Sequence, residues 1–122
     1  MSSSLTNYQK ARRAEDAASQ VRGRHYVDWV PILDQWRKER RDDESLALLV
    51  EIIDAAERAA RVAGREPAPG YTKRAATIYR RRKDYAAEVA VLRRWLAACP
   101  PGRGSAAIEE RLRTAEQLPA AQ

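Results

Sequence analysis

The chain has 122 residues and a formal net charge of +6, with 44% hydrophobic and 33% charged residues. This length suits a single domain, residues 1–122, with a modest core. The single cysteine, Cys99, excludes an internal disulfide and a cysteine-rich zinc site. Because no apolar run is long enough for a membrane span or a signal peptide, we expect a cytoplasmic protein, and nothing in the composition points to a cofactor.

An N-terminal helix is predicted over residues 5–22. Thr6 and Gln9 have the spacing of a capping box, in which both side chains satisfy free N–H groups of the first helical turn. The apolar stripe that follows is made mostly of small side chains, namely Tyr8, Ala11, Ala14, Ala18 and Val21. Since such a stripe buries little surface, this helix is expected to depend on packing against the rest of the chain.

A first helix pair is predicted over residues 26–63. Asp28 is expected to cap its first helix, with Pro31 in the first turn, where no helical hydrogen bond is lost. The apolar residues of this helix recur at helical spacing: Trp29, Ile32, Leu33 and Trp36.

The second helix of this pair is predicted to begin at residues 42–44, three acids that favour the positive end of the helix dipole. Its apolar face is expected to consist of Leu46, Leu49, Val50, Ile53 and Ala56. On its exposed side the spacing predicts ion pairs one turn apart, Asp54 with Arg58 and Glu57 with Arg61.

A second helix pair is predicted over residues 69–98, with a tight turn at Lys83 and Asp84. Its inward residues are expected to include Ile78 and Leu92. Ser105 is placed to cap a last helix over residues 105–118, which would cover the end of the stack. No segment alternates polar and apolar residues over the length of a strand, so the predicted fold class is all-α, without strands.

The two helix pairs can be aligned with each other at an offset of 43 residues. Ser45 lies nine positions after Trp36 in the first pair, and Glu88 lies nine positions after Tyr79 in the second. With these residues, and with a Lys-Asp-Tyr turn at 83–85 in place of Gly-Asp-Tyr, residues 26–100 resemble the tetratricopeptide repeat (TPR) family. The chain departs from the family pattern at positions where a Trp, a Leu or a small residue is usual: Thr72, Ala75, Ser45 and Glu88.

The resemblance implies an α-solenoid of about two TPR-like repeats, with the N- and C-terminal helices flanking the stack. In TPR proteins the first helix of each repeat lines a concave groove. The groove-facing positions of the family fall here on eight residues: Val30, Asp34, Arg37, Lys38, Lys73, Thr77, Arg80 and Arg81.

The net charge of the chain is concentrated in one stretch. Residues 69–83 contain six basic residues and no acid, while the rest of the chain has 17 basic and 17 acidic residues. The stretch is either a solvated helix face or a binding surface for acidic groups, which arginine captures in bidentate fashion. In the second case the predicted partner-binding residues are Lys73, Thr77, Arg80, Arg81, Arg37 and Lys38, and reversing Arg80 and Arg81 to Glu is expected to spare the fold.

No catalytic motif is present, and a lone His25 and a Cys99 at a helix C-terminus do not suggest an active site, so we expect no enzyme activity. The leading hypothesis is a protein-interaction module that binds an acidic segment or a C-terminal carboxylate in a basic groove. Nucleic-acid binding through the same arginines is the alternative. A structural homo-oligomer is a third hypothesis, because two repeats are fewer than a stable stack usually needs.

Overall fold

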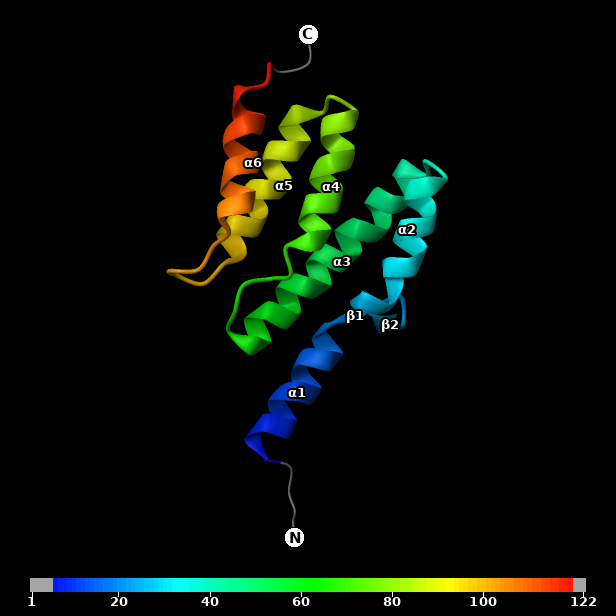
Figure 1. Ribbon diagram of the computed structural model, residues 1–122. Coiled ribbons are helices and arrows are strands. Elements are labelled where there is room, and N and C mark those ends of the chain that lie inside the picture. Colours follow the sequence, from blue (N-terminus) through cyan, green and yellow to red (C-terminus); the bar gives the residue numbers. More distant parts are fainter. Residues whose placement is uncertain (1–5, 120–122) are drawn as a thin grey trace.

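The computed structural model describes residues 6–119, and this part of the chain is mostly helical (75%), with six α-helices packed in sequence order (Figure 1). The all-α prediction is confirmed at this level. The helices are α1 (Asn7–Ala18), α2 (Val30–Lys38), α3 (Asp42–Ala63), α4 (Gly70–Arg81), α5 (Tyr85–Ala98) and α6 (Ala106–Gln117).

The expectation that the chain contains no strands is wrong at one place. Residues β1 (Gln20–Val21) and β2 (Arg24–His25) form a two-residue antiparallel hairpin. Arg22 and Gly23, which join the strands, both have positive φ (49° and 85°), as the two central residues of a type I′ hairpin turn must. Two residues per strand are too few to produce an alternating pattern, so the sequence carried no strand signal beyond the turn.

The start of the first helix pair also differs from the prediction. Residues Tyr26–Trp29 form a short 3₁₀ helix, η1, which is capped by the Nδ1 atom of His25 accepting from the Val27 N–H at 3.1 Å. Asp28 therefore caps nothing and lies inside η1. Pro31 falls in the first turn of α2, as predicted.

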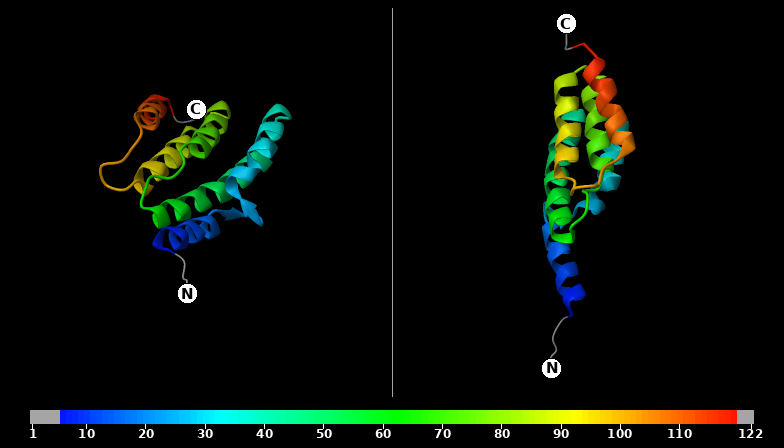
Figure 2. Two further views of the ribbon diagram at one scale, coloured as in Figure 1. Left: turned by 60° about the horizontal axis from the view of Figure 1, so that its bottom comes forward. Right: turned by 90° about the vertical axis from the view of Figure 1, so that its left-hand side faces the viewer.

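The 22-residue helix α3 is the central element of the N-terminal half, because both α1 and α2 pack against it. α2 packs against α3 near its N-terminus, and α1 packs along its C-terminal half (Figures 1 and 2). α1 has its predicted capping box at Thr6 but buries no residue of its own. It is held by Arg58, whose guanidinium donates to the carbonyls of Ala18 and Gln20, each at 3.2 Å, and by an ion pair between Glu15 and Arg65.

The buried side chains form two clusters. The first lies between α2, α3 and α4 and contains, among others, Leu33, Leu48, Leu49, Ile52, Ile53, Ala75 and Ile78. The second joins α4, α5 and α6 through Ala76, Leu92, Trp95, Ile108 and Ala115. Leu92 is fully buried, as predicted, whereas Trp36 is only partly buried at the edge of the first cluster.

The turns between α2 and α3 and between α4 and α5 have matching geometry. Arg40 and Lys83 occupy the left-handed region, with φ of 58° and 60°. In each turn the next residue donates its N–H to a carbonyl five residues back, Arg41 to Trp36 and Asp84 to Tyr79, both at 2.9 Å. This conformation favours glycine, since a Cβ atom destabilises it.

We predict that Leu92→Ala lowers the free energy of unfolding by about 2–5 kcal/mol, because it leaves a cavity in the second cluster. Urea denaturation followed by circular dichroism would measure the loss. Val62→Ala is the matched control, because Val62 is 44% exposed on α3 and its truncation should change stability by less than about 0.5 kcal/mol. Equal losses in the two variants would contradict the assignment of Leu92 to the core.

We also predict that Lys83→Gly raises the free energy of unfolding by roughly 0.5 kcal/mol, because glycine adopts the left-handed conformation without a steric penalty. Arg40→Gly should behave in the same way, since its backbone conformation is the same. The readout is the thermal midpoint of each variant. A lower midpoint in both would show that these turns do not hold the left-handed geometry.

Candidate binding pocket

Helix α4 carries the basic stretch, and most of its arginines are paired with acids from other elements. Four ion pairs of 2.6–2.9 Å join residues that are far apart or on different helices: Arg74 with Asp34, Arg80 with Glu88, Arg81 with Asp42, and Arg82 with Asp43. The charge that is concentrated in the sequence is therefore largely neutralised in the fold. Three of these acids lie about 40 residues from their arginines along the chain, so the spacing of neighbouring residues could not predict the pairs.

The pair of Arg80 and Glu88 lies between α4 and α5. Glu88 is 0% exposed, and its two carboxylate oxygens face the guanidinium of Arg80, with Nε–Oε1 and Nη2–Oε2 distances of 3.1 and 2.6 Å. Arg80 supplies the counter-charge that the burial of Glu88 requires. Arg80 is thus a contact between helices, so reversing it to Glu would disturb the fold.

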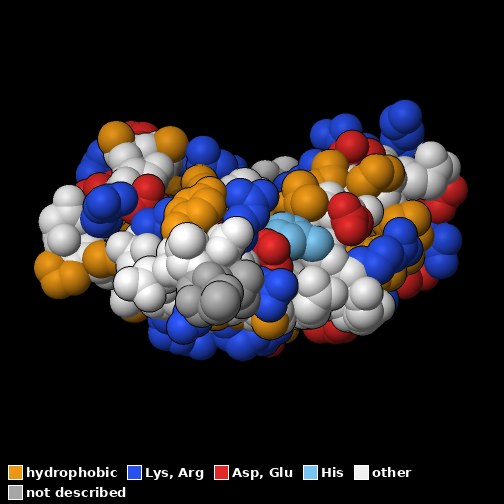
Figure 3. Space-filling model, turned by 90° about the horizontal axis from the view of Figure 1, so that it is seen from below, with side chains coloured by type: hydrophobic (Ala, Val, Ile, Leu, Met, Phe, Trp, Pro, Cys, Tyr) orange, Lys and Arg blue, Asp and Glu red, His pale blue; other side chains and the backbone are white. Residues whose placement is uncertain are grey.

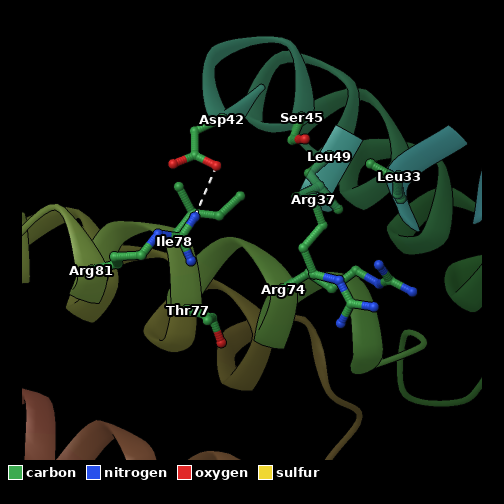
Figure 4. Close-up of a pocket in the computed structure, with 9 residues that line it drawn as sticks. All are labelled: Leu33, Arg37, Asp42, Ser45, Leu49, Arg74, Thr77, Ile78 and Arg81. Atoms are coloured by element: carbon green, nitrogen blue, oxygen red, sulfur yellow. Dashed lines mark hydrogen bonds and ion pairs between the residues drawn. The ribbon is translucent and has the colours of Figure 1, made fainter. Parts of the chain in front are cut away.

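A pocket of about 310 Å³ opens between α2, the start of α3, and α4 (Figure 4). Its apolar floor consists of Leu33, Leu49 and Ile78, all of which are buried. Ser45 and Thr77 also line it. Its charged lining residues are Arg37, Asp42, Arg74 and Arg81. We refer to this hollow as the α2–α4 pocket.

The charges of the α2–α4 pocket are only partly matched. Arg81 pairs with Asp42 at one end, and Arg74 pairs with Asp34 at 2.9 Å. Arg37 is exposed and has no acidic partner among residues 6–119. The pocket therefore keeps one positive charge that the described part of the fold does not neutralise.

Helix α6 brings a further arginine to α4. The guanidinium of Arg111 donates to the hydroxyl of Thr77 at 3.1 Å and to the carbonyl of Lys73 at 3.5 Å. Both partners are neutral oxygens. The Thr77 hydroxyl in turn donates to the Lys73 carbonyl at 2.9 Å.

Of the six predicted partner-binding residues, the structure brings Arg37, Thr77 and Arg81 to the α2–α4 pocket. Lys38, Lys73 and Arg80 do not line it. Sequence reasoning missed Arg74 as a site residue. It could have been found, because it lies four residues before Ile78 on the same helix.

Other residues that might carry chemistry have structural roles. Burial raises the pKa of the Cys99 thiol, so it is less reactive than an ordinary cysteine, and its Sγ donates to the Trp95 carbonyl. The side chain of His25 caps η1. Among the described residues no group of three His, Cys, Asp or Glu could hold a metal ion. Within residues 6–119, no helix is long and apolar enough to cross a membrane.

Comparison with known proteins assigns neither a family nor a function to this chain. No family matches the chain, and neither a curated protein nor a solved structure is significantly similar to it. The geometry and charges of the α2–α4 pocket are therefore the basis for a functional proposal.

We predict that Arg80→Met lowers the free energy of unfolding by about 3 kcal/mol or more, because it leaves the buried Glu88 carboxylate without a counter-charge. Adding Glu88→Leu should recover much of this loss, since two apolar side chains can replace a buried ion pair. Arg113→Met is the control: Arg113 pairs with Glu110 at the surface, and its loss should cost no more than about 0.5 kcal/mol. If Arg80→Met alone lowers the free energy of unfolding no more than Arg113→Met does, a structural role for Arg80 is contradicted.

Proposed function

We propose that this protein is a non-catalytic, TPR-like interaction module that binds an acidic protein segment in the α2–α4 pocket. The observation that carries the proposal is the composition of that pocket. It combines a buried apolar floor with three arginines, of which Arg37 has no acidic partner within residues 6–119. Concave sites of this size, mostly apolar and with a few convergent polar groups, are typical of ligand sites.

The TPR-like part of the proposal is supported by the two turns that join α2 to α3 and α4 to α5. Arg40 and Lys83 lie 43 residues apart, the offset at which the two helix pairs align, and share the same backbone conformation. α2 and α4 would then be the first helices of two successive repeats. The α2–α4 pocket would be the groove between them, where Arg37, Thr77 and Arg81 match groove positions of the family.

The ion pairs favour an acidic protein segment over a nucleic acid. A nucleic-acid duplex is bound mainly by neutralising several phosphates along its length, which takes a continuous set of free basic side chains. Arg74, Arg80, Arg81 and Arg82 are already paired. On the face seen from below, basic side chains are interspersed with acidic and uncharged ones (Figure 3). A homo-oligomer would be one form of this proposal, with an acidic segment of a second copy as the ligand.

We predict that Arg37→Glu weakens binding to acidic peptides at least about tenfold, because it replaces the uncommitted positive charge of the pocket with a repulsive one. The measurement is fluorescence anisotropy with a set of labelled 12-residue acidic peptides, and neutral peptides of the same length give the background. The helix content should be unchanged, since Arg37 makes no ion pair within residues 6–119.

Arg13→Glu is the matched control, because Arg13 is exposed on α1 and distant in sequence from the pocket. Equal effects of the two variants would mean that net charge and not the pocket controls binding. A labelled DNA duplex provides the other test. If it binds more tightly than every acidic peptide, with a log–log salt slope of about −0.9 per contacted phosphate, the nucleic-acid alternative is correct.

A further inference from the structure

The positive charge of the α2–α4 pocket is unevenly distributed. At one end Arg81 and Asp42 satisfy each other at 2.8 Å. At the other end the guanidinium groups of Arg37 and Arg74 lie on the same side of the pocket (Figure 4). Within residues 6–119, only Asp34 pairs with either of them, through a single contact to Arg74 at 2.9 Å. Two guanidinium groups that have one carboxylate partner in all can accept one more carboxylate.

The same pocket limits the charge of its ligand. Asp42 lines the pocket, and Asp34 is paired with the lining residue Arg74, so each repels a carboxylate that is not placed between the arginines. A ligand with several adjacent acids would bring at least one of them close to these aspartates. The pocket is therefore built for a ligand with one carboxylate and not for a highly acidic stretch.

The apolar floor defines the rest of the ligand. Leu33, Leu49 and Ile78 are the aliphatic lining residues, and although little of each is exposed (2%, 1% and 8%), their hydrocarbon side chains favour an aliphatic ligand side chain over a polar one. Arg37 lies one helical turn beyond Leu33 on α2, and Arg74 lies one turn before Ile78 on α4, a rise of about 5.4 Å to 6 Å in each case. In an extended peptide, residues i and i+2 point to the same side and lie roughly 6.6 Å apart.

We propose that the α2–α4 pocket recognises an internal aliphatic-x-acidic motif, in which the aliphatic side chain rests on the floor and the acidic side chain binds between Arg37 and Arg74. This inference rests on the proposed function and narrows its ligand from acidic segments in general to a motif with one carboxylate. Asp34 and Asp42 are then the residues that exclude more acidic segments, and Leu33, Leu49 and Ile78 are those that require the aliphatic residue.

The test uses four short peptides and the full-length ¹⁵N-labelled protein, with amide shifts as the readout of binding. The reference peptide is acetyl-Gly-Ser-Leu-Ser-Glu-Ser-Gly-amide, whose blocked ends leave a single carboxylate. In the second and third peptides the Leu is replaced by Ala and by Glu. The fourth, acetyl-Gly-Ser-Gly-Ser-Leu with a free C-terminus, carries its carboxylate on the chain end.

We expect the reference peptide to bind at least about tenfold more tightly than the Ala peptide, because the Ala peptide buries less apolar surface. The Glu peptide should also bind more weakly than the reference peptide, although it carries more negative charge. Shifts should map to residues around the pocket, and Arg37→Ala should abolish them while Arg13→Ala leaves them unchanged. In the Asp42→Asn variant, the difference in affinity between the reference peptide and the Glu peptide should become smaller.

Each other outcome overturns the inference in a distinguishable way. If the Glu peptide binds as tightly as the reference peptide or more tightly, the aliphatic-x-acidic motif is wrong, but an acidic-segment module remains. If the free-terminus peptide binds most tightly, the pocket is a site for chain ends. If no acidic peptide binds here or in the larger peptide set, both the motif and the proposed function are wrong.

Discussion

Arginine side chains that bridge neighbouring helices hold this fold together. The apolar core is small, since seven of the 18 buried hydrophobic residues in the described part of the chain are alanines, which bury little surface each. Arginine contacts supplement it at successive interfaces. Arg94 of α5 reaches Asp54 and Glu57 of α3, and the hydrogen bonds that its guanidinium donates to Glu57 and Asp54 raise its pKa above the ordinary value. Arg93 of the same helix reaches α6 through Glu116.

The arrangement accounts for the composition of α4. A helix with six positive charges in and around it and no acid would be destabilised by like-charge repulsion on its own. In the fold, acids of α2, α3 and α5 face its arginines, so the repulsion is replaced by attraction between elements. The same arrangement limits function, because an arginine that is paired with a carboxylate of the chain is less available to a ligand. What distinguishes Arg37 from Arg74 and Arg81 is the lack of such a pairing within the described residues.

The sequence was sufficient for several features that depend on neighbouring residues, although the expected cap at Asp28 is wrong because His25 caps η1. The capping roles of Thr6 and Ser105 follow from local hydrogen bonds, and the burial of Leu92 follows from helical periodicity. It failed where partners are distant along the chain. The expected pairs of Asp54 with Arg58 and of Glu57 with Arg61 are wrong, because both acids turn to Arg94 of α5.

The candidate site likewise combines features that follow from neighbouring residues with contacts between distant residues, which the sequence did not predict. Helical spacing placed Thr77 and Arg81 on the outward face of their helix, the family resemblance pointed to Arg37, and the structure brings these three residues together. Neither signal showed that Arg80 pairs with the buried Glu88, because in the sequence Glu88 was only a departure from the family pattern. Nor did they show that Arg111 contacts Thr77, because this contact forms only once α6 is packed.

The salt dependence of stability tests the central claim most directly. If the arginines of α4 are paired as described, the attractions outweigh the repulsion expected from a net charge of +6. Raising NaCl from about 10 mM to about 300 mM shortens the screening length from roughly 30 Å to under 10 Å and should then lower the free energy of unfolding in urea. A free energy of unfolding that rises with salt would show that uncompensated repulsion dominates, and would contradict the account.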